Sequence, residues 1–140
     1  MRELSVTDQA QRGDADWILK AMLAVASADG RLEPREIGLI QQVYRGQSGR
    51  SLTAGEIDRE AEGNSRANLL AELAAVSKML SMDTKEEMVR AAYLVLLADD
   101  RIAGEERKRV QDIATALQIP EIHFGAILEE LAVSLAGQKS

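Results

Sequence analysis

Apolar residues recur every three or four positions through most of the chain, which is the spacing expected of amphipathic α-helices. Together with N-cap and stop signals, this spacing predicts helices over 15–28, 34–44, 54–62, 66–80, 83–98, 104–117 and 120–136. No segment alternates apolar and polar residues over the length of a half-buried strand. We therefore predict an all-α fold of about seven helices, forming a single domain over residues 1–140 with a flexible N-terminus at 1–13.

The first predicted helix, 15–28, differs from the others because its apolar side chains cover more than one face. These residues are Trp17, Ile18, Ala21, Met22 and Val25. A helix that is apolar on several faces is buried on several faces, so this one is expected at the centre of the domain, with Asp14 as its N-cap.

Capping boxes mark two further helix starts. The spacings Thr53 to Glu56 and Asp83 to Glu86 both fit a side chain and a backbone N–H that exchange hydrogen bonds across the first turn. Between the second and third helices, residues 45–51 are rich in Gly, Ser and polar residues, and we expect a loose connection there.

The sequence also contains an internal repeat, because the segment 28–36 recurs in similar form at 98–106. The matching pairs, all 70 positions apart, are Ala28/Ala98, Asp29/Asp99, Arg31/Arg101, Leu32/Ile102 and Glu36/Glu106. A repeat of this length predicts two pseudo-symmetric helix-turn-helix units, each with carboxylates at its turn.

Composition narrows the classes of function. A net charge of −6 disfavours binding to phosphate backbones, so no nucleic-acid partner is expected. The absence of cysteine excludes disulfides, thiolate metal sites and thiol nucleophiles. Residues 1–16 lack the apolar stretch of a signal peptide and no apolar run could span a bilayer, so we expect a cytoplasmic protein with no direct membrane insertion.

The acidic turns are the only concentrated chemistry, and they permit two interpretations. In one, Asp29, Glu36, Asp99, Asp100 and Glu106 cap helices and satisfy turn amides, as Glu36 would at the third position of a helix that starts with Pro34. In the other, the turns of the two units lie at one end of the molecule, where their carboxylates bind a divalent cation or a basic protein surface. A divalent cation is the only cofactor that the sequence suggests.

An EF-hand is rejected for these turns. The segment from Asp29 to Glu36 overlays only the second half of such a loop, and in that register Val25 would take the position of the first ligand. In the second copy Val95 takes that position, so neither loop could wrap a calcium ion in the usual way.

No catalytic residues are predicted, and we expect the protein not to be an enzyme. His123 is the only histidine, and helical periodicity does not place it with the acidic turns. No glycine-rich phosphate loop and no Ser-His-Asp arrangement can be argued. An enzyme that uses Asp and Glu in acid–base chemistry is the third alternative, after the two kinds of binding module described below.

The doubled motif resembles the TerB-like family, named for tellurite-resistance proteins. The resemblance runs from about Ala15 to Leu135 and includes 94–99, Glu106 and 113–117. It implies an all-helical domain that serves tellurite resistance and related stress responses, with metal-binding acidic positions and protein partners, some of them membrane-associated. The acidic positions that the resemblance implies as metal-binding are Asp29, Glu36, Asp99 and Glu106. Asp100 stands where glycine is usual in the family.

A related domain occurs in DnaJ-type co-chaperones, but no His-Pro-Asp signature is present in this chain. The leading hypothesis is therefore a TerB-like binding module with acidic turns. The alternative is a structural or co-chaperone-like accessory domain that uses apolar helix faces to form a homodimer or to hold a complex together.

Overall fold

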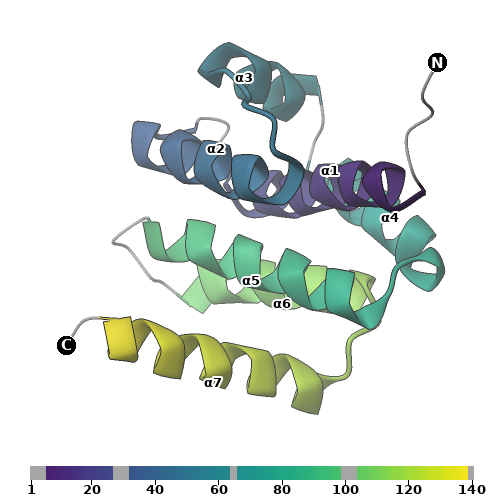
Figure 1. Ribbon diagram of the computed structural model, residues 1–140. Helices are drawn as coiled ribbons and strands as arrows, with labels where there is room; N and C mark the ends of the chain where they lie inside the picture. The colour runs from purple at the N-terminus through teal and green to yellow at the C-terminus, as the bar shows by residue number, and fades with distance from the viewer. Residues whose placement is uncertain (1–5, 27–31, 64–65, 99–103, 139–140) are drawn as a thin grey trace.

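The computed structural model describes residues 6–26, 32–63, 66–98 and 104–138, with the side chains of 6–14, 63, 66, 98, 104–107 and 135–138 left aside. Within these ranges it contains seven α-helices, one 3₁₀ helix and no strand, which confirms the predicted all-α class (Figure 1). The elements are α1 (Val6–Ala26), α2 (Pro34–Ser48), α3 (Ala54–Gly63), α4 (Arg66–Val76), η2 (Ser77–Met79), α5 (Met82–Ala98), α6 (Gly104–Ala116) and α7 (Glu121–Gln138).

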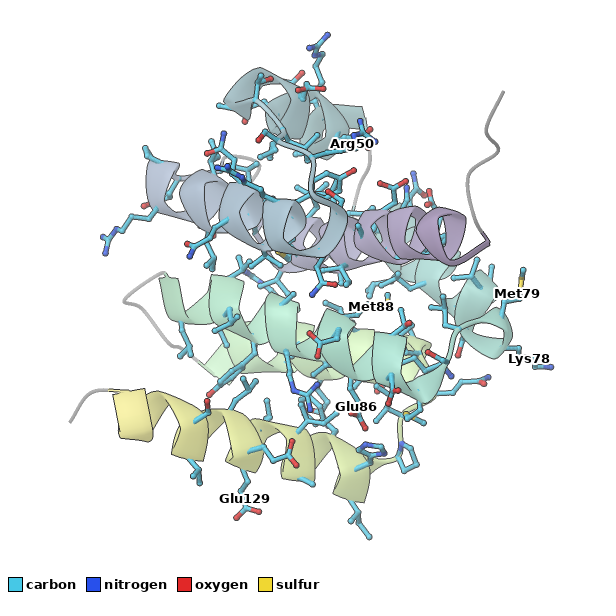
Figure 2. All side chains as sticks on the ribbon, in the orientation of Figure 1. Arg50, Lys78, Met79, Glu86, Met88 and Glu129 are labelled. Atoms are coloured by element: carbon cyan, nitrogen blue, oxygen red, sulfur yellow. The ribbon has the colours of Figure 1, made fainter. Side chains whose placement is uncertain are left out.

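The helices are stacked in layers. From top to bottom in Figure 1, α3 lies over α2, α1 and α2 lie over α5 and α6, and α7 covers the lower side. Met88 of α5 is fully buried and lies between its own helix and the layer of α1 and α2 (Figure 2). No helix in the described part of the chain is long and apolar enough to cross a membrane.

Helix α1 is central, as its all-round apolar pattern predicts. It packs against α2, α4, α5 and α6, and every residue from Ala21 to Ala26 is buried. Its predicted start is wrong, because the helix begins at Val6 and Asp14 lies inside it rather than at its N-cap. The added turns are mostly polar, so they carry no amphipathic signal, but extending an existing helix costs far less than nucleating one.

The two repeated segments begin their second helices in the same register. Helix α2 starts at Pro34 and α6 at Gly104, which are 70 positions apart, like the sequence repeat itself. Packing between the segments is reciprocal: α1 contacts α5, α1 contacts α6, and α2 contacts α5. The pseudo-two-fold relation between the units stays a prediction.

One predicted capping box is confirmed and one is wrong. Thr53 N–H donates to Glu56 Oε1 at 2.9 Å and Glu56 N–H donates to Thr53 Oγ1 at 3.1 Å, as predicted. At α5, however, it is Ser81 that caps the helix, because its Oγ accepts the Thr84 N–H at 3.1 Å. This N-cap lies two residues before Asp83, so Glu86 falls beyond the capping position and is available to other helices.

Two other boundaries differ from the prediction. Helix α2 continues through Arg45 to Ser48, and Gly49, with a φ of 76°, forms its left-handed C-cap. Most of the loose connection predicted over 45–51 is therefore helical, and only its last residues lie outside a helix. Helix α4 stops at Val76 rather than Leu80 and passes into η2. There the buried Ser77 hydroxyl donates to the carbonyl of Leu117 at 2.8 Å, which ties this turn to the end of α6.

Candidate functional site

The helix ends beside the two acidic turns lie at the same end of the molecule. In Figure 1, α5 ends and α2 and α6 begin toward the left, whereas the N-terminal end of α1 is at the right. The cation hypothesis requires the two turns to share one end of the molecule, and the described helix ends next to them do so. Asp29, Asp99 and Asp100 themselves lie outside the described residues, so their predicted roles as metal ligands stay predictions.

Glu36 is the one predicted site residue whose side chain is described. It is buried, with 8% of its surface exposed, and its Oε1 accepts the backbone N–H of Glu33 at 2.9 Å. Glu33 is the N-cap and Pro34 follows it, so Glu36 completes a capping box at the start of α2. The capping role predicted for Glu36 is confirmed, and its role as a metal ligand stays a prediction.

Glu106 occupies the matching place in the second unit. It is the third residue of α6, as Glu36 is the third residue of α2. Negative charge in a first turn interacts favourably with the helix dipole, whatever else it binds. Among the described residues, no three side chains of the His, Cys, Asp or Glu type are gathered as a metal site.

His123 lies in a charged cluster between α5 and α7, which the sequence analysis missed. Its Nε2 is 2.7 Å from Glu86 Oε2, and Glu86 lies in Figure 2 between the two helices. Arg90, one turn after Glu86, forms salt bridges with Glu87 at 2.9 Å and with Glu130 of α7 at 3.1 Å. Partial burial lowers the pKa of Arg90, but its hydrogen bond to Glu130 and the nearby carboxylates outweigh this effect and raise the pKa overall.

This cluster joins α5 to α7. The carboxylates of Glu86 and Glu130 each meet a basic group from the opposite helix. The salt bridge between Glu86 and Arg90 could have been predicted from the sequence, because the two residues are four positions apart on one helix. The contacts of this pair with α7 could not have been predicted in this way, because they join residues far apart in the sequence.

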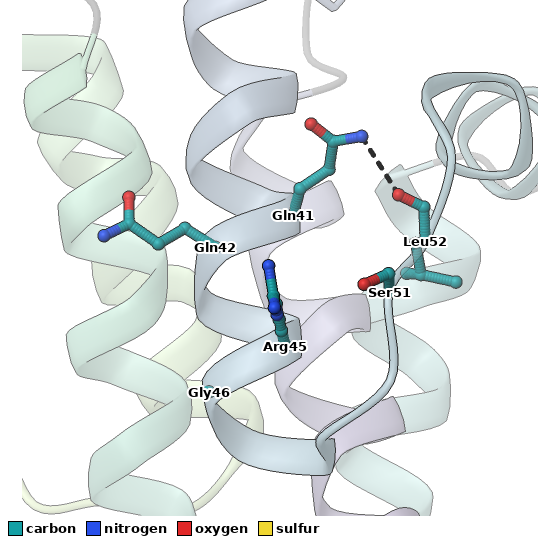
Figure 3. A pocket seen from close by; sticks show the side chains of 6 residues that line it. All are labelled: Gln41, Gln42, Arg45, Gly46, Ser51 and Leu52. Carbon is teal, nitrogen blue, oxygen red and sulfur yellow. Dashed lines mark hydrogen bonds between the residues drawn. The ribbon is translucent and has the colours of Figure 1, made fainter.

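A second feature is an open pocket of about 650 Å³ between the outer face of α2 and the segment that follows it (Figure 3). Its lining residues are Gln41, Gln42, Arg45, Gly46, Ser51 and Leu52. The Gln41 side chain donates to the carbonyl of Leu52 at 3.0 Å, which holds the segment against the helix. The pocket was not predicted, because the composition of 45–51 is that of a loose connection.

Comparison of the chain with models of protein families, with curated proteins and with solved structures finds no match.

Proposed function

We propose that this protein is a non-enzymatic binding module of the TerB-like kind, whose two acidic turns together bind a divalent cation. The observation that carries the proposal is the common register of the two units, which begins α2 and α6 70 positions apart and puts Glu36 and Glu106 at the same helical position. Tellurite resistance and stress response belong to the proposal through the family resemblance alone.

The chemistry of the turns suits a hard cation. Such ions take several oxygen ligands, six to eight for Ca²⁺, and Asp29, Asp99 and Asp100 add three carboxylates to those of the two glutamates. Glu36 already accepts the N–H of Glu33, so its orientation is fixed before any ion arrives. An ion bound by both turns would join the two units and stabilise the folded state in proportion to its concentration over Kd.

Titration calorimetry with Ca²⁺, Mg²⁺, Mn²⁺ and Zn²⁺ tests this proposal. We expect at least one of the ions to bind, and the double variant Asp29→Asn, Asp99→Asn to bind it at least tenfold more weakly. The matched control is Asp58→Asn with Glu129→Gln, which removes the same charge from exposed positions on α3 and α7 and should leave binding unchanged. Absence of heat with the wild type, or equal binding by both double variants, would refute the cation site.

A basic protein partner is the other occupant that these carboxylates fit. If no ion binds, the same pair of double variants can be compared for retention of a Lys-rich peptide. Retention that is lost only in the turn variant would support this version of the proposal.

The second candidate function is a structural module that dimerises or holds a complex through apolar helix surface. The supporting observation is on α7, where Ile122 and Val133 are 89% and 73% exposed. Light scattering over a range of concentrations tests it: the mass should double with the wild type and remain that of a monomer for Ile122→Ser with Val133→Ser. A wild type that is monomeric throughout would contradict dimerisation.

A further inference from the structure

We propose that the pocket between α2 and residues 51–52 binds the phosphate group of a small phosphomonoester. This function goes beyond the cation site proposed above, and it uses different residues at the other end of the same helix. Eleven residues separate Pro34 from Arg45, which is about 16 Å along an α-helix at 1.5 Å per residue. Failure of one site therefore leaves the other testable.

The charge pattern around the pocket is opposite to that of the chain. The protein has a net charge of −6, but from Ile37 to Gly55 it contains no Asp or Glu, and the only charged residues there are Arg45 and Arg50. The carboxylates that flank this segment, Glu36 and Glu56, each accept a backbone N–H at 2.9 Å at their own helix start. They are thus held as caps, and the one charged residue among those that line the pocket is Arg45.

The lining residues supply hydrogen-bond donors from two walls. In Figure 3, Arg45 lies between Gln42 on one side and Ser51 on the other. Arg45 is exposed and forms no salt bridge within the described residues. The Gln42 amide extends away from Ser51 in Figure 3, so the guanidinium of Arg45 and the hydroxyl of Ser51 are the donors for a tetrahedral anion. Arg is the side chain best suited to bidentate binding of phosphate.

The wall opposite α2 is fixed by local hydrogen bonds. After the left-handed Gly49, the Ser48 hydroxyl donates to the carbonyl of Tyr44 at 2.8 Å and accepts the N–H of Arg50 at 3.0 Å. The bond from Gln41 to the carbonyl of Leu52 closes the other side of this segment. The pocket is therefore formed before a ligand binds, which reduces the entropy lost on binding.

Its size indicates a ligand larger than the anion alone. A volume of about 650 Å³ is within the range of roughly 300–1,000 Å³ usual for small-molecule sites. Leu52 adds an apolar side chain to the lining, and a Cβ added at Gly46 would meet no atom within 4 Å, so space is open above the helix there. Room remains for the organic part of a phosphomonoester.

The test is a titration of the ¹⁵N-labelled protein with sn-glycerol 3-phosphate, inorganic phosphate and acetate at equal ionic strength, followed by amide shifts. We expect shifts confined to 41–52, with affinity in the order glycerol phosphate, phosphate, acetate. Arg45→Gln should weaken binding at least tenfold. Gly46→Leu should abolish it by filling the space, and Gly38→Leu on the same helix, where a Cβ also meets nothing within 4 Å, is the matched control that should still bind.

Sedimentation with vesicles that contain phosphatidic acid separates the two sources of such a group. Sedimentation that is lost in Arg45→Gln assigns the phosphate to a lipid headgroup, and glycerol phosphate binding without sedimentation assigns it to a free metabolite. Tight binding of acetate, undiminished binding by Gly46→Leu, or no binding of any phosphate would overturn the proposal.

Discussion

Over the residues that the structure describes, α1 and α7 are the two longest helices, at 21 and 18 residues, yet they have opposite places in the fold. Helix α1 packs against four other helices, whereas α7 packs mainly on α5 and leaves Ile122 and Val133 exposed. Both contain many apolar residues. The comparison shows that apolar content alone does not determine which helix is central, because α7 is rich in apolar residues and still leaves part of its apolar surface exposed.

The polar bonds of the two helices follow the same division. Helix α1 is tied to α2 by the Tyr44 hydroxyl, which donates to Asp16 at 3.1 Å, and to α4 by the salt bridge of Lys20 with Glu72 at 2.9 Å. Among the side chains that the structure describes, α7 is tied to α5, through His123 and Glu130. We infer that α1 unfolds only with the whole domain, while α7 can open locally at a lower free energy.

The largest expected effect is a difference between the same substitution in the two helices. Leu23 is fully buried in α1, so Leu23→Ala should lower the free energy of unfolding by about 2–5 kcal/mol. Leu131 in α7 is only partly buried, and Leu131→Ala should cost well below that range. Urea denaturation of both variants measures the difference.

Equal losses for the two variants would break the comparison between the helices. The control is Leu70→Ala, another partly buried leucine, from α4. If Leu70→Ala resembles Leu131→Ala, partial burial explains the small effect rather than any peculiarity of α7.

The central position of α1 could be predicted because it depends on local information. Apolar residues at 17, 18, 21, 22 and 25 cover several faces of any helix, and the structure buries four of them fully and Trp17 in part. The start of α1 could not be predicted, because its first turns carry polar residues that fit a helix or a loop equally well.

The same distinction separates the parts of the candidate site. The capping role of Glu36 was predictable, because Glu33 and Glu36 are three residues apart and interact within one helical turn. The pairing of His123 with Glu86 joins residues 37 positions apart, and the pocket beside α2 depends on how the chain folds back after Gly49. No periodicity in the sequence encodes such contacts.

A smaller effect is expected at the bond between α1 and α2. Burial raises the pKa of Tyr44, and the Asp16 carboxylate that accepts its hydroxyl proton adds to this. The folded state then favours neutral Tyr44, so this contribution to stability is present at neutral pH and is lost as the pH rises past 10. Tyr44→Phe should cost about 0.5–1.5 kcal/mol at pH 7.

The pH dependence of this difference is the measurement that identifies its cause. Urea denaturation of wild type and Tyr44→Phe from pH 7 to pH 11 should show the two stabilities converging above pH 10. There the Tyr44 phenol ionises more readily in the unfolded wild type than in the folded one, and Tyr44→Phe has no phenol to ionise. Tyr93→Phe is the control, since Tyr93 is only half-buried on α5. A constant gap between wild type and Tyr44→Phe over the whole range would show that the bond to Asp16 does not couple to ionisation.

The smallest effect is expected where α7 meets α5. His123 and Glu86 are 2.7 Å apart, but their side chains are 32% and 24% exposed, so solvent screens the pair. A double-mutant cycle with His123→Gln and Glu86→Gln should give a coupling of about 0.2–1 kcal/mol at pH 6. Because this pair holds only a peripheral helix, amide hydrogen exchange in α7 should accelerate in both single variants while exchange in α1 stays unchanged. Faster exchange in α1 would mean that α7 opens only together with the core, and the contrast between the two helices would then not hold.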